Sequence, residues 1–218
     1  MLNHEQIKQA LTHVLWIGGS PDAGKTSVGT ALAEKKGWLF YSCDEHAEAL
    51  LTNHILNDPV AFWPTWVKRP VDARWLEPVE NQAQNMLRIE TDLFPWITSE
   101  LLTMSTQMPI VVEGNLPPNL ISPYLTTKHQ ALWMIPTPAF ARASFDRRGK
   151  DDHSERSDPR RVRENHMARD RLLGEHSKRE AEARALKVLE IDGTHPIEEV
   201  SEIARNHFEP HLSQQDER

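Results

Sequence analysis

Five short apolar runs recur along the chain, and segments long enough for helices separate them. The runs lie at 13–19, 38–44, 109–115, 131–137 and 187–193. Apolar runs of this length, bounded by Gly or Pro, are typical of buried strands. Strands that alternate with helices form a parallel sheet that is covered on both faces. The pattern therefore predicts an α/β fold with a five-stranded parallel sheet.

Helix signals follow the first run and the last. Residues 27–36 carry apolar positions at helical spacing and stop at Gly37, which suits a helix C-terminus. Another helix is expected over 197–208, and a third is expected to begin after Ser157-Asp158-Pro159. Two stretches are longer than a simple crossover between strands requires. Residues 45–108 contain four of the seven tryptophans and more than one predicted helix, and residues 139–186 are rich in arginine.

The composition fits one globular domain with elaborations. The chain has 218 residues, of which 39% are hydrophobic and 26% charged. No window approaches 18 uninterrupted apolar residues, so we expect no membrane partner. The N-terminus lacks a basic segment followed by an apolar one, so a signal peptide is not expected. The single cysteine, Cys43, allows no intrachain disulfide, which favours a reducing compartment, the cytoplasm.

The charge is unevenly distributed. The formal net charge is −7, yet residues 142–187 carry 14 of the 25 Lys and Arg and 10 of the 32 Asp and Glu, a local balance of +4. An acidic remainder argues against a nucleic-acid partner. The basic segment suits a small anionic ligand nearby, and equally a solvated helix laced with ion pairs.

One motif carries specific chemistry. The segment GSPDAGKT at 19–26 matches the P-loop pattern G-x-x-x-x-G-K-[ST] and lies between a predicted strand and a predicted helix. Its glycines allow backbone N–H groups to converge on a phosphate, and the helix N-terminus faces the same anion. The alternative is an accidental glycine turn before a helix. The predicted nucleotide-binding residues are Gly19, Ser20, Pro21, Asp22, Ala23, Gly24, Lys25, Thr26 and Ser27.

From these residues the chain resembles P-loop kinases of small molecules: nucleoside monophosphate kinases, shikimate and gluconate kinases, and chloramphenicol phosphotransferase. The resemblance implies a three-layer P-loop NTPase fold with strand order 2-3-1-4-5. It also implies one domain over 1–218, with a helical substrate-binding insert at 45–108 and an arginine-rich lid at 139–186. ATP and Mg²⁺ would be used, with Lys25 on the β- and γ-phosphates and Thr26 on the metal.

Two acids at strand ends are candidates for the reacting centre. In the resembling families the strand after the P-loop helix often ends in an acid that faces the acceptor, and here that acid is Asp44. It would receive or orient an acceptor hydroxyl, although it also suits a helix N-cap. Glu113 ends another strand. It would hold a Mg²⁺-bound water or bind substrate, and its length leaves direct metal ligation open.

Arginines supply the remaining predicted contacts. Arg161, Asn165 and Arg169 recur at helical spacing and share one face. The resemblance to a lid implies that Arg169 contacts phosphate, with Arg161 and Arg163 weaker candidates; Arg147 and Arg148 stay undecided. In the insert, Arg69 and Arg74 lie among prolines and tryptophans and are candidate ligands for the acceptor. Most of the tryptophans are expected in the insert's core rather than stacked on nucleic acid.

The function that these residues predict is Mg-ATP-dependent transfer of a phosphoryl group to a small-molecule acceptor, in particular to a hydroxyl. Two alternatives stay open: a nucleoside monophosphate kinase, and an ATP-binding regulatory module that is not a kinase. The loop at 192–196 is expected near the adenine. No [NT]-K-x-D motif is present, which disfavours guanine. The acceptor and the oligomeric state are not predicted.

Overall fold

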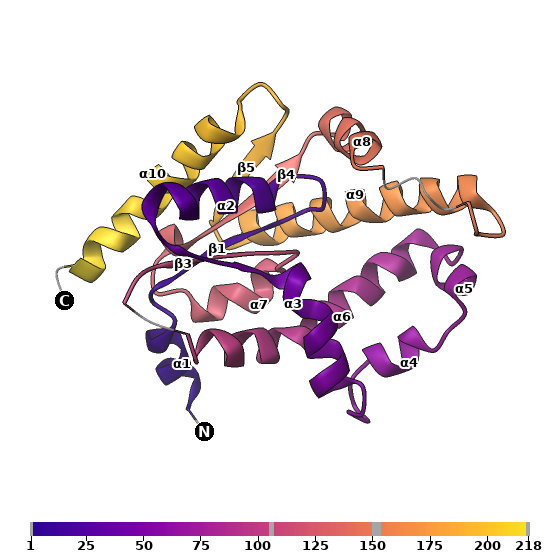
Figure 1. Cartoon of the computed structure of the whole chain (residues 1–218), viewed down its shortest axis with the longest axis horizontal. Coiled ribbons are helices and arrows are strands. Elements are labelled where there is room, and N and C mark those ends of the chain that lie inside the picture. Colours follow the sequence, from indigo (N-terminus) through magenta and orange to yellow (C-terminus); the bar gives the residue numbers. More distant parts are fainter. Residues whose placement is uncertain (1, 105–106, 150–153, 217–218) are drawn as a thin grey trace.

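The computed structural model describes residues 2–104, 107–149 and 154–216, and within them one parallel sheet is the centre of the fold (Figure 1). Its order, β2-β3-β1-β4-β5, confirms the predicted order. The strands are β1 (Val14–Gly19), β2 (Leu39–Ser42), β3 (Ile110–Glu113), β4 (Ala131–Pro136) and β5 (Lys187–Ile191). Each lies within one of the five apolar runs.

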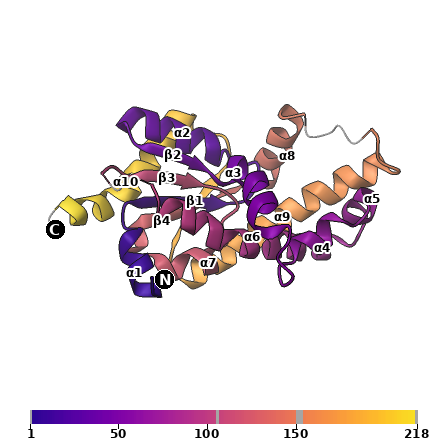
Figure 2. The same cartoon turned by 60° about the horizontal axis from the view of Figure 1, so that its bottom comes forward.

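Side chains of the central strand alternate between two cores. Leu15 and Ile17 belong to the core beneath α2 (Lys25–Lys36) and α10 (Ile197–Asp216). Val14 and Trp16 face the opposite core, which includes residues of α6 (Val79–Leu101) and α9 (Pro159–Ala183). Figure 2 shows the resulting three layers, with α2 on one side of the sheet and α6 and α7 (Pro118–Ile121) on the other. The period-2 pattern of β1 thus produces both cores.

Strand β2 is shorter than predicted. It ends at Ser42, and helix α3 (Cys43–Leu50) begins at once with Ser42 as its N-cap. Asp44 therefore lies in the first turn of α3 rather than in the strand. Acidic side chains are stabilised there because the helix dipole presents positive charge at its N-terminus. The difference arises because Ser42, a residue type favoured at helix N-caps, ends the strand, while buried Tyr41 and Cys43 on either side continue the apolar pattern.

The region 45–108 is largely helical. After α3 it contains η1 (Leu51–Ile55), α4 (Trp63–Val67), α5 (Val71–Trp75) and α6. Apolar residues at helical spacing bury one face of α6: Ile89, Leu93, Ile97 and Leu101. Helix α4 packs against α6, whereas α5 packs against α9. Trp63, Trp66 and Trp96 are partly buried against the core.

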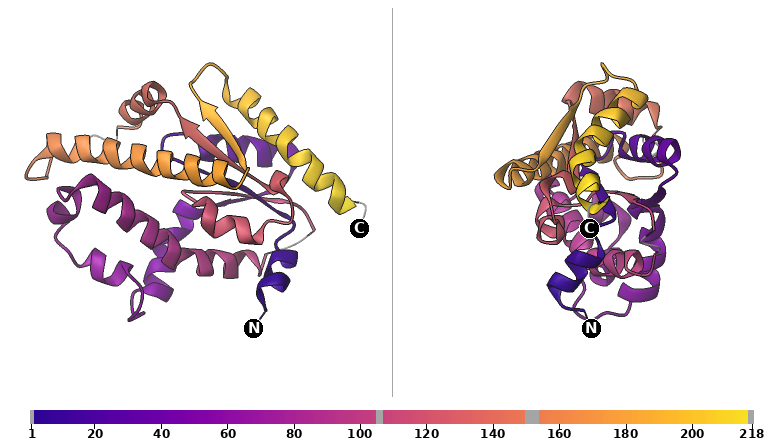
Figure 3. Two further views of the ribbon diagram at one scale, coloured as in Figure 1. Left: turned by 180° about the vertical axis from the view of Figure 1, so that it is seen from behind. Right: turned by 90° about the vertical axis from the view of Figure 1, so that its left-hand side faces the viewer.

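The C-terminal half carries two helices that reach away from the sheet. Helix α8 (Pro138–Arg147) follows β4, and the long α9 returns to β5 (Figure 3). Asp158 caps α9 by accepting a hydrogen bond from the Arg161 N–H, 3.1 Å away. The remaining short elements are α1 (His4–Ala10), η2 (Ser122–Tyr124) and η3 (Lys128–Gln130). Within the described ranges, no helix has the length and apolar character to cross a membrane.

A buried amide joins the start of β1 to the start of β4. Gln130 is fully buried, and its Nε2 donates to the carbonyl oxygens of Leu11 and Val14 at 2.8 and 3.0 Å. Its Oε1 accepts from the Thr126 N–H at 2.9 Å and from the Thr126 hydroxyl at 3.1 Å. One side chain thus satisfies several buried backbone groups at the edge opposite the P-loop.

We expect Gln130→Leu to lower the free energy of unfolding by about 2–5 kcal/mol, because buried carbonyl and N–H groups lose their partners. Gln84→Leu, at an exposed position of α6, should change it by less than about 0.5 kcal/mol. Urea denaturation of both variants measures the difference. Equal stability of the two would contradict the structural role given to the Gln130 amide.

Candidate active site

The P-loop joins β1 to α2 and bends where the motif predicts. Gly19 has φ +124°, and Gly24 has φ +81°. A Cβ at position 19 would lie 2.1 Å from the carbonyl oxygen of Met134, so only glycine allows the loop to approach β4 this closely. Ser20 donates its N–H to the same carbonyl at 3.1 Å. The loop is therefore fixed to the sheet before it turns into α2.

Lys25 is buried at the start of α2. Its Nζ donates to the Ser20 carbonyl at 2.9 Å and to Asn115 Oδ1 at 3.3 Å. Burial lowers the pKa of Lys25, and the negative charges of Glu113 and Asp44 oppose that change. A buried ammonium with two neutral acceptors keeps capacity for an anionic partner.

A chain of hydrogen bonds links the P-loop to the ends of β2 and β3. Glu113 is buried, and its Oε1 accepts from the Ser42 hydroxyl at 2.7 Å and from the Thr26 hydroxyl at 3.2 Å. The parallel register places Ser42 directly opposite Glu113. The carboxylate therefore orients the Thr26 side chain at the N-terminus of α2.

These groups line one small cavity, which we call the phosphate cavity. Its volume is about 160 Å³. Of the predicted residues, it contains Pro21, Asp22, Gly24, Lys25, Thr26, Asp44, Glu113 and Arg169. The exposed carboxylate of Asp44 reaches this space from α3. The structure therefore brings the P-loop, both candidate acids and Arg169 together at one cavity.

Helix α9 lies directly against the P-loop. The Ser20 hydroxyl donates to the Asp170 carbonyl at 3.1 Å, and a Cβ at Gly174 would lie 3.0 Å from Ser20 Oγ. Arg169 donates to Asp170 Oδ1 through Nε at 2.9 Å and through Nη2 at 2.6 Å. Its guanidinium also lies 5.1 Å from the ring centre of Trp75. A carboxylate and an aromatic ring thus hold Arg169 at the cavity.

The other predicted arginines lie elsewhere. Arg161 is exposed and donates to the Leu76 carbonyl at 3.4 Å. Arg69 forms an ion pair with Glu77 at 2.8 Å, and Arg74 stacks over Trp66 at 4.5 Å. None of the three lines a described cavity. Arg161 connects α9 to the segment after α5. The face of α9 that carries both Arg161 and Arg169 therefore also contacts the insert.

Several residues at the cavity were not selected from the sequence. Asn115 follows Glu113 by two positions, and that spacing at a strand end was the available signal. Arg148, His166 and Asp170 also line the phosphate cavity. Nothing in the sequence distinguishes Arg148 from its neighbour Arg147, or Asp170 from the other acids of a charged helix.

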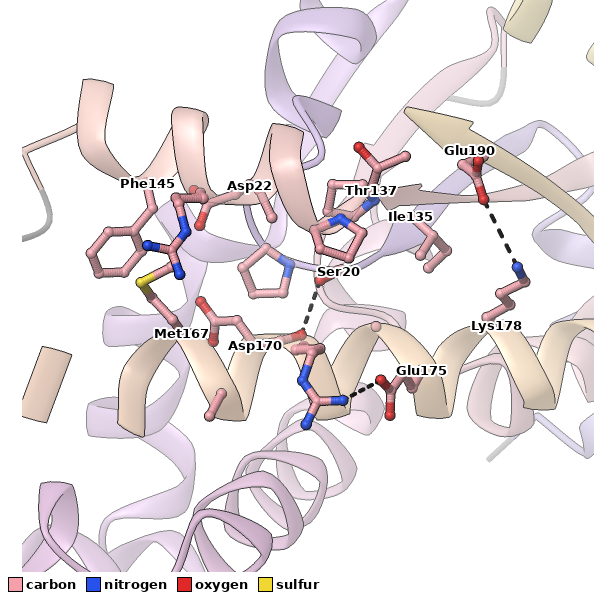
Figure 4. Close-up of a pocket in the computed structure, with 18 of the residues that line it drawn as sticks. Ser20, Asp22, Ile135, Thr137, Phe145, Met167, Asp170, Glu175, Lys178 and Glu190 are labelled. Atoms are coloured by element: carbon pink, nitrogen blue, oxygen red, sulfur yellow. Dashed lines mark hydrogen bonds and ion pairs between the residues drawn. The ribbon is translucent and has the colours of Figure 1, made fainter. Parts of the chain in front are cut away.

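A larger cavity lies on the other side of the P-loop, between α8 and α9 (Figure 4). Its volume is about 750 Å³. Apolar side chains such as Ile135 and Met167 line it, with charged groups around them. Asp22 and Asp170 line both cavities, and they stand between them. The loop at 192–196, expected near adenine, is not part of the lining of either cavity.

No family model and no curated protein matches the sequence. Solved structures with a similar arrangement include shikimate kinase from Acinetobacter baumannii in complex with shikimate (15% identity, 95% of this chain and 98% of that chain, TM-score 0.44). Shikimate kinase from Aquifex aeolicus is also similar (17% identity, 91% and 98%, TM-score 0.40). So is an uncharacterized protein from Eubacterium ventriosum (14% identity, 90% and 98%, TM-score 0.44). Because these TM-scores lie below 0.5, the fold assignment rests on the strand order and the P-loop.

Glu90 of α6 is a further acid near this centre. It lines a small recess together with Gly19, Pro21 and Asn115. Burial, reinforced by the charge of Asp44, raises the pKa of Glu90 to about 8, although Lys25 opposes the shift. The folded state therefore favours the protonated carboxyl. This contribution to stability is complete below the ordinary pKa of 4.5 and is lost as the pH rises through about 8.

We expect Glu90→Gln to leave stability nearly unchanged at pH 4.5 and to make the folded protein more stable than wild type at pH 8.5. The reason is that the amide keeps the neutral form at every pH. Urea denaturation across this range measures the effect, with Glu48→Gln at an exposed position of α3 as control. The same stability difference at both pH values would contradict a raised pKa.

Proposed function

We propose that the protein is a P-loop kinase that transfers the γ-phosphoryl group of ATP to a small-molecule acceptor. The observation that carries this proposal is the convergence of Lys25, Asp44 and Arg169 on one cavity at the P-loop. A phosphate-binding loop alone would suit any nucleotide-binding protein. A carboxylate and a held arginine in the same cavity suit transfer to a second molecule.

The residues divide the work as follows. The loop N–H groups and the α2 N-terminus bind the phosphates, and Lys25 neutralises their charge. Arg169, held by Asp170 and Trp75, faces the transferring group from α9. Positioning and charge neutralisation supply most of the rate in phosphoryl transfer, because its transition state needs little covalent help. Oriented side chains, which need no reorganisation, are therefore the main requirement.

The residues present fit a magnesium ion. Mg²⁺ prefers oxygen ligands and is usually held by one or two protein groups together with substrate phosphates. The Thr26 hydroxyl and the buried Glu113 carboxylate are 3.2 Å apart and provide such a donor set. Bound there with ATP, the ion would neutralise charge on the β- and γ-phosphates. No cluster of three or more His, Cys, Asp or Glu suited to a metal occurs in the described part of the chain.

A hydroxyl acceptor is the better candidate of the two substrate types. A monophosphate acceptor requires several arginines around its phosphate, yet Arg69 is paired with Glu77, and Arg74 lies over Trp66. By contrast, the Asp44 carboxylate lines the phosphate cavity, and Glu90 lines the recess beside the P-loop. Asp44 would accept the hydroxyl proton as the oxygen attacks the γ-phosphorus.

We expect Lys25→Met to lower acceptor-stimulated ADP formation at least about 100-fold, because the variant loses the cation on the β- and γ-phosphates. The assay follows ADP release from Mg-ATP with a panel of sugars, hydroxy acids, nucleosides, nucleotides and antibiotics. Lys36→Met, exposed at the far end of α2, should behave as wild type. Transfer by the Lys25 variant at the wild-type rate would overturn the kinase assignment.

Asp44→Asn should reduce transfer about 10²- to 10⁴-fold while ATP-analogue binding stays near that of wild type, because the amide cannot accept the hydroxyl proton. Single-turnover measurements with the stimulating acceptor test this, with Glu45→Gln at the adjacent exposed position as control. Near-normal transfer by Asp44→Asn would favour a monophosphate acceptor instead.

The panel also distinguishes a kinase from a regulatory module. A module that only binds ATP would bind the nucleotide tightly, and no compound would stimulate its consumption. Stimulation by one chemical class of acceptor would support the kinase.

A further inference from the structure

The P-loop contains an acid, Asp22, whose side chain has no part in the function proposed above. Asp22 is 4% exposed. Its backbone has φ +62°, a conformation that Asp and Asn adopt more readily than most residues do. A P-loop binds anions, so a buried carboxylate within it repels the ligand that the loop serves. Such a group requires a compensating partner.

One such partner comes from the end of α8. Arg148 Nη1 lies 3.5 Å from Asp22 Oδ1, while the Arg148 side chain is 43% exposed. Arg148 is the C-cap residue of α8 and lines the phosphate cavity together with Asp22 and Lys25. The contact therefore connects the segment between β4 and α9 to the nucleotide-binding loop.

The second arginine of the cavity is also paired with a buried acid, through closer contacts. Arg169 is held by the buried carboxylate of Asp170, as Arg148 is paired with that of Asp22. Both acids lie between the phosphate cavity and the larger cavity behind it. Each of the two arginines thus contacts a buried carboxylate and also lines the phosphate cavity.

We propose that Asp22 is a positioning residue that holds the Arg148 guanidinium at the phosphate cavity, so that nucleotide binds with both groups in place. This inference rests on the proposed triphosphate site but not on any acceptor. The two charges act as a unit, because Arg148 contacts the phosphates and also neutralises the acid beside them. Removing Arg148 alone leaves the Asp22 charge beside the ligand without this cation, which costs more than removing both groups.

The test is a double-mutant cycle on the binding of a non-hydrolysable ATP analogue with Mg²⁺, measured by calorimetry. Arg148→Met should weaken binding roughly 30-fold, and Asp22→Asn should weaken it by no more than about 5-fold. The double variant should bind about 10-fold tighter than Arg148→Met alone, because the carboxylate that Arg148 neutralised is gone. Asn suits the positive φ at position 22, so the loop conformation is kept.

Two controls separate positioning from a structural role. Arg147→Met changes the neighbouring exposed arginine, which lines neither cavity, and its effect should simply multiply with that of Asp22→Asn. Asp22→Glu keeps the charge pair and should retain binding within about 5-fold of wild type. Thermal unfolding of every variant confirms that the fold is intact. Inorganic tripolyphosphate should reproduce the cycle, whereas adenosine should not respond to Arg148→Met.

Independent, multiplying effects of Asp22→Asn and Arg148→Met would overturn the proposal. Tighter binding by Asp22→Asn than by wild type would also overturn it, because the acid would then restrain Arg148 rather than position it. If wild type itself binds neither the ATP analogue nor tripolyphosphate, the proposed kinase function fails, and the pairing loses its role with it.

Discussion

A buried ammonium group is the constraint around which the site is organised. Lys25 lies at the start of α2, and a charge taken out of water must be solvated by protein groups. Ser20 and Asn115 supply oxygens, and Glu113 and Asp44 supply negative charge. These groups come from the P-loop, from the end of β3 and from α3. The strand order brings these ends together, because β1 lies between β3 and β4 and parallel strands all end on one side.

The charges around the phosphate cavity are arranged in pairs rather than as a simple positive pocket. Lys25, Arg148 and Arg169 each lie close to an acid. This arrangement limits the repulsion among three cations in the absence of ligand. It also fixes the directions of these cations, which matters more than their total charge for the phosphoryl transfer proposed above. The formal charge of the chain, −7 with a basic stretch at 142–187, conveys none of this detail.

The parts of the fold that follow from short-range pattern were predictable. Each strand is an apolar run, and the P-loop is a contiguous motif whose glycines have the positive φ values that it requires. The C-terminus of α2 at Gly37 is also local, with φ +68°. By contrast, Asp44 was expected at a strand end, and the structure places it in the first turn of α3 instead.

Roles that depend on tertiary placement could not be read from the sequence. Glu90 follows the buried Ile89 on an amphipathic helix, and only the docking of α6 against α9 brings it beside the P-loop. Arg147 and Arg148 are adjacent and chemically identical, and the last turn of α8 directs only Arg148 into the cavity. Arg161 shares a helix face with Arg169, yet the insert occupies its end of that face. The candidate arginines therefore needed the structure to separate them.

The absence of a side chain at Gly174 has a mechanical consequence. Helix α9 is 25 residues long, and it rests on Ser20 with no side chain in between. From this contact to Pro159 the helix extends about 22 Å. The Ser20 side chain of the P-loop is therefore a pivot point on which the helix rests. A tilt of about 5° would carry the Pro159 end by about 2 Å while the contact at Ser20 barely moves. A small displacement of the Pro159 end is thus compatible with an unchanged contact at Ser20 in one uninterrupted helix.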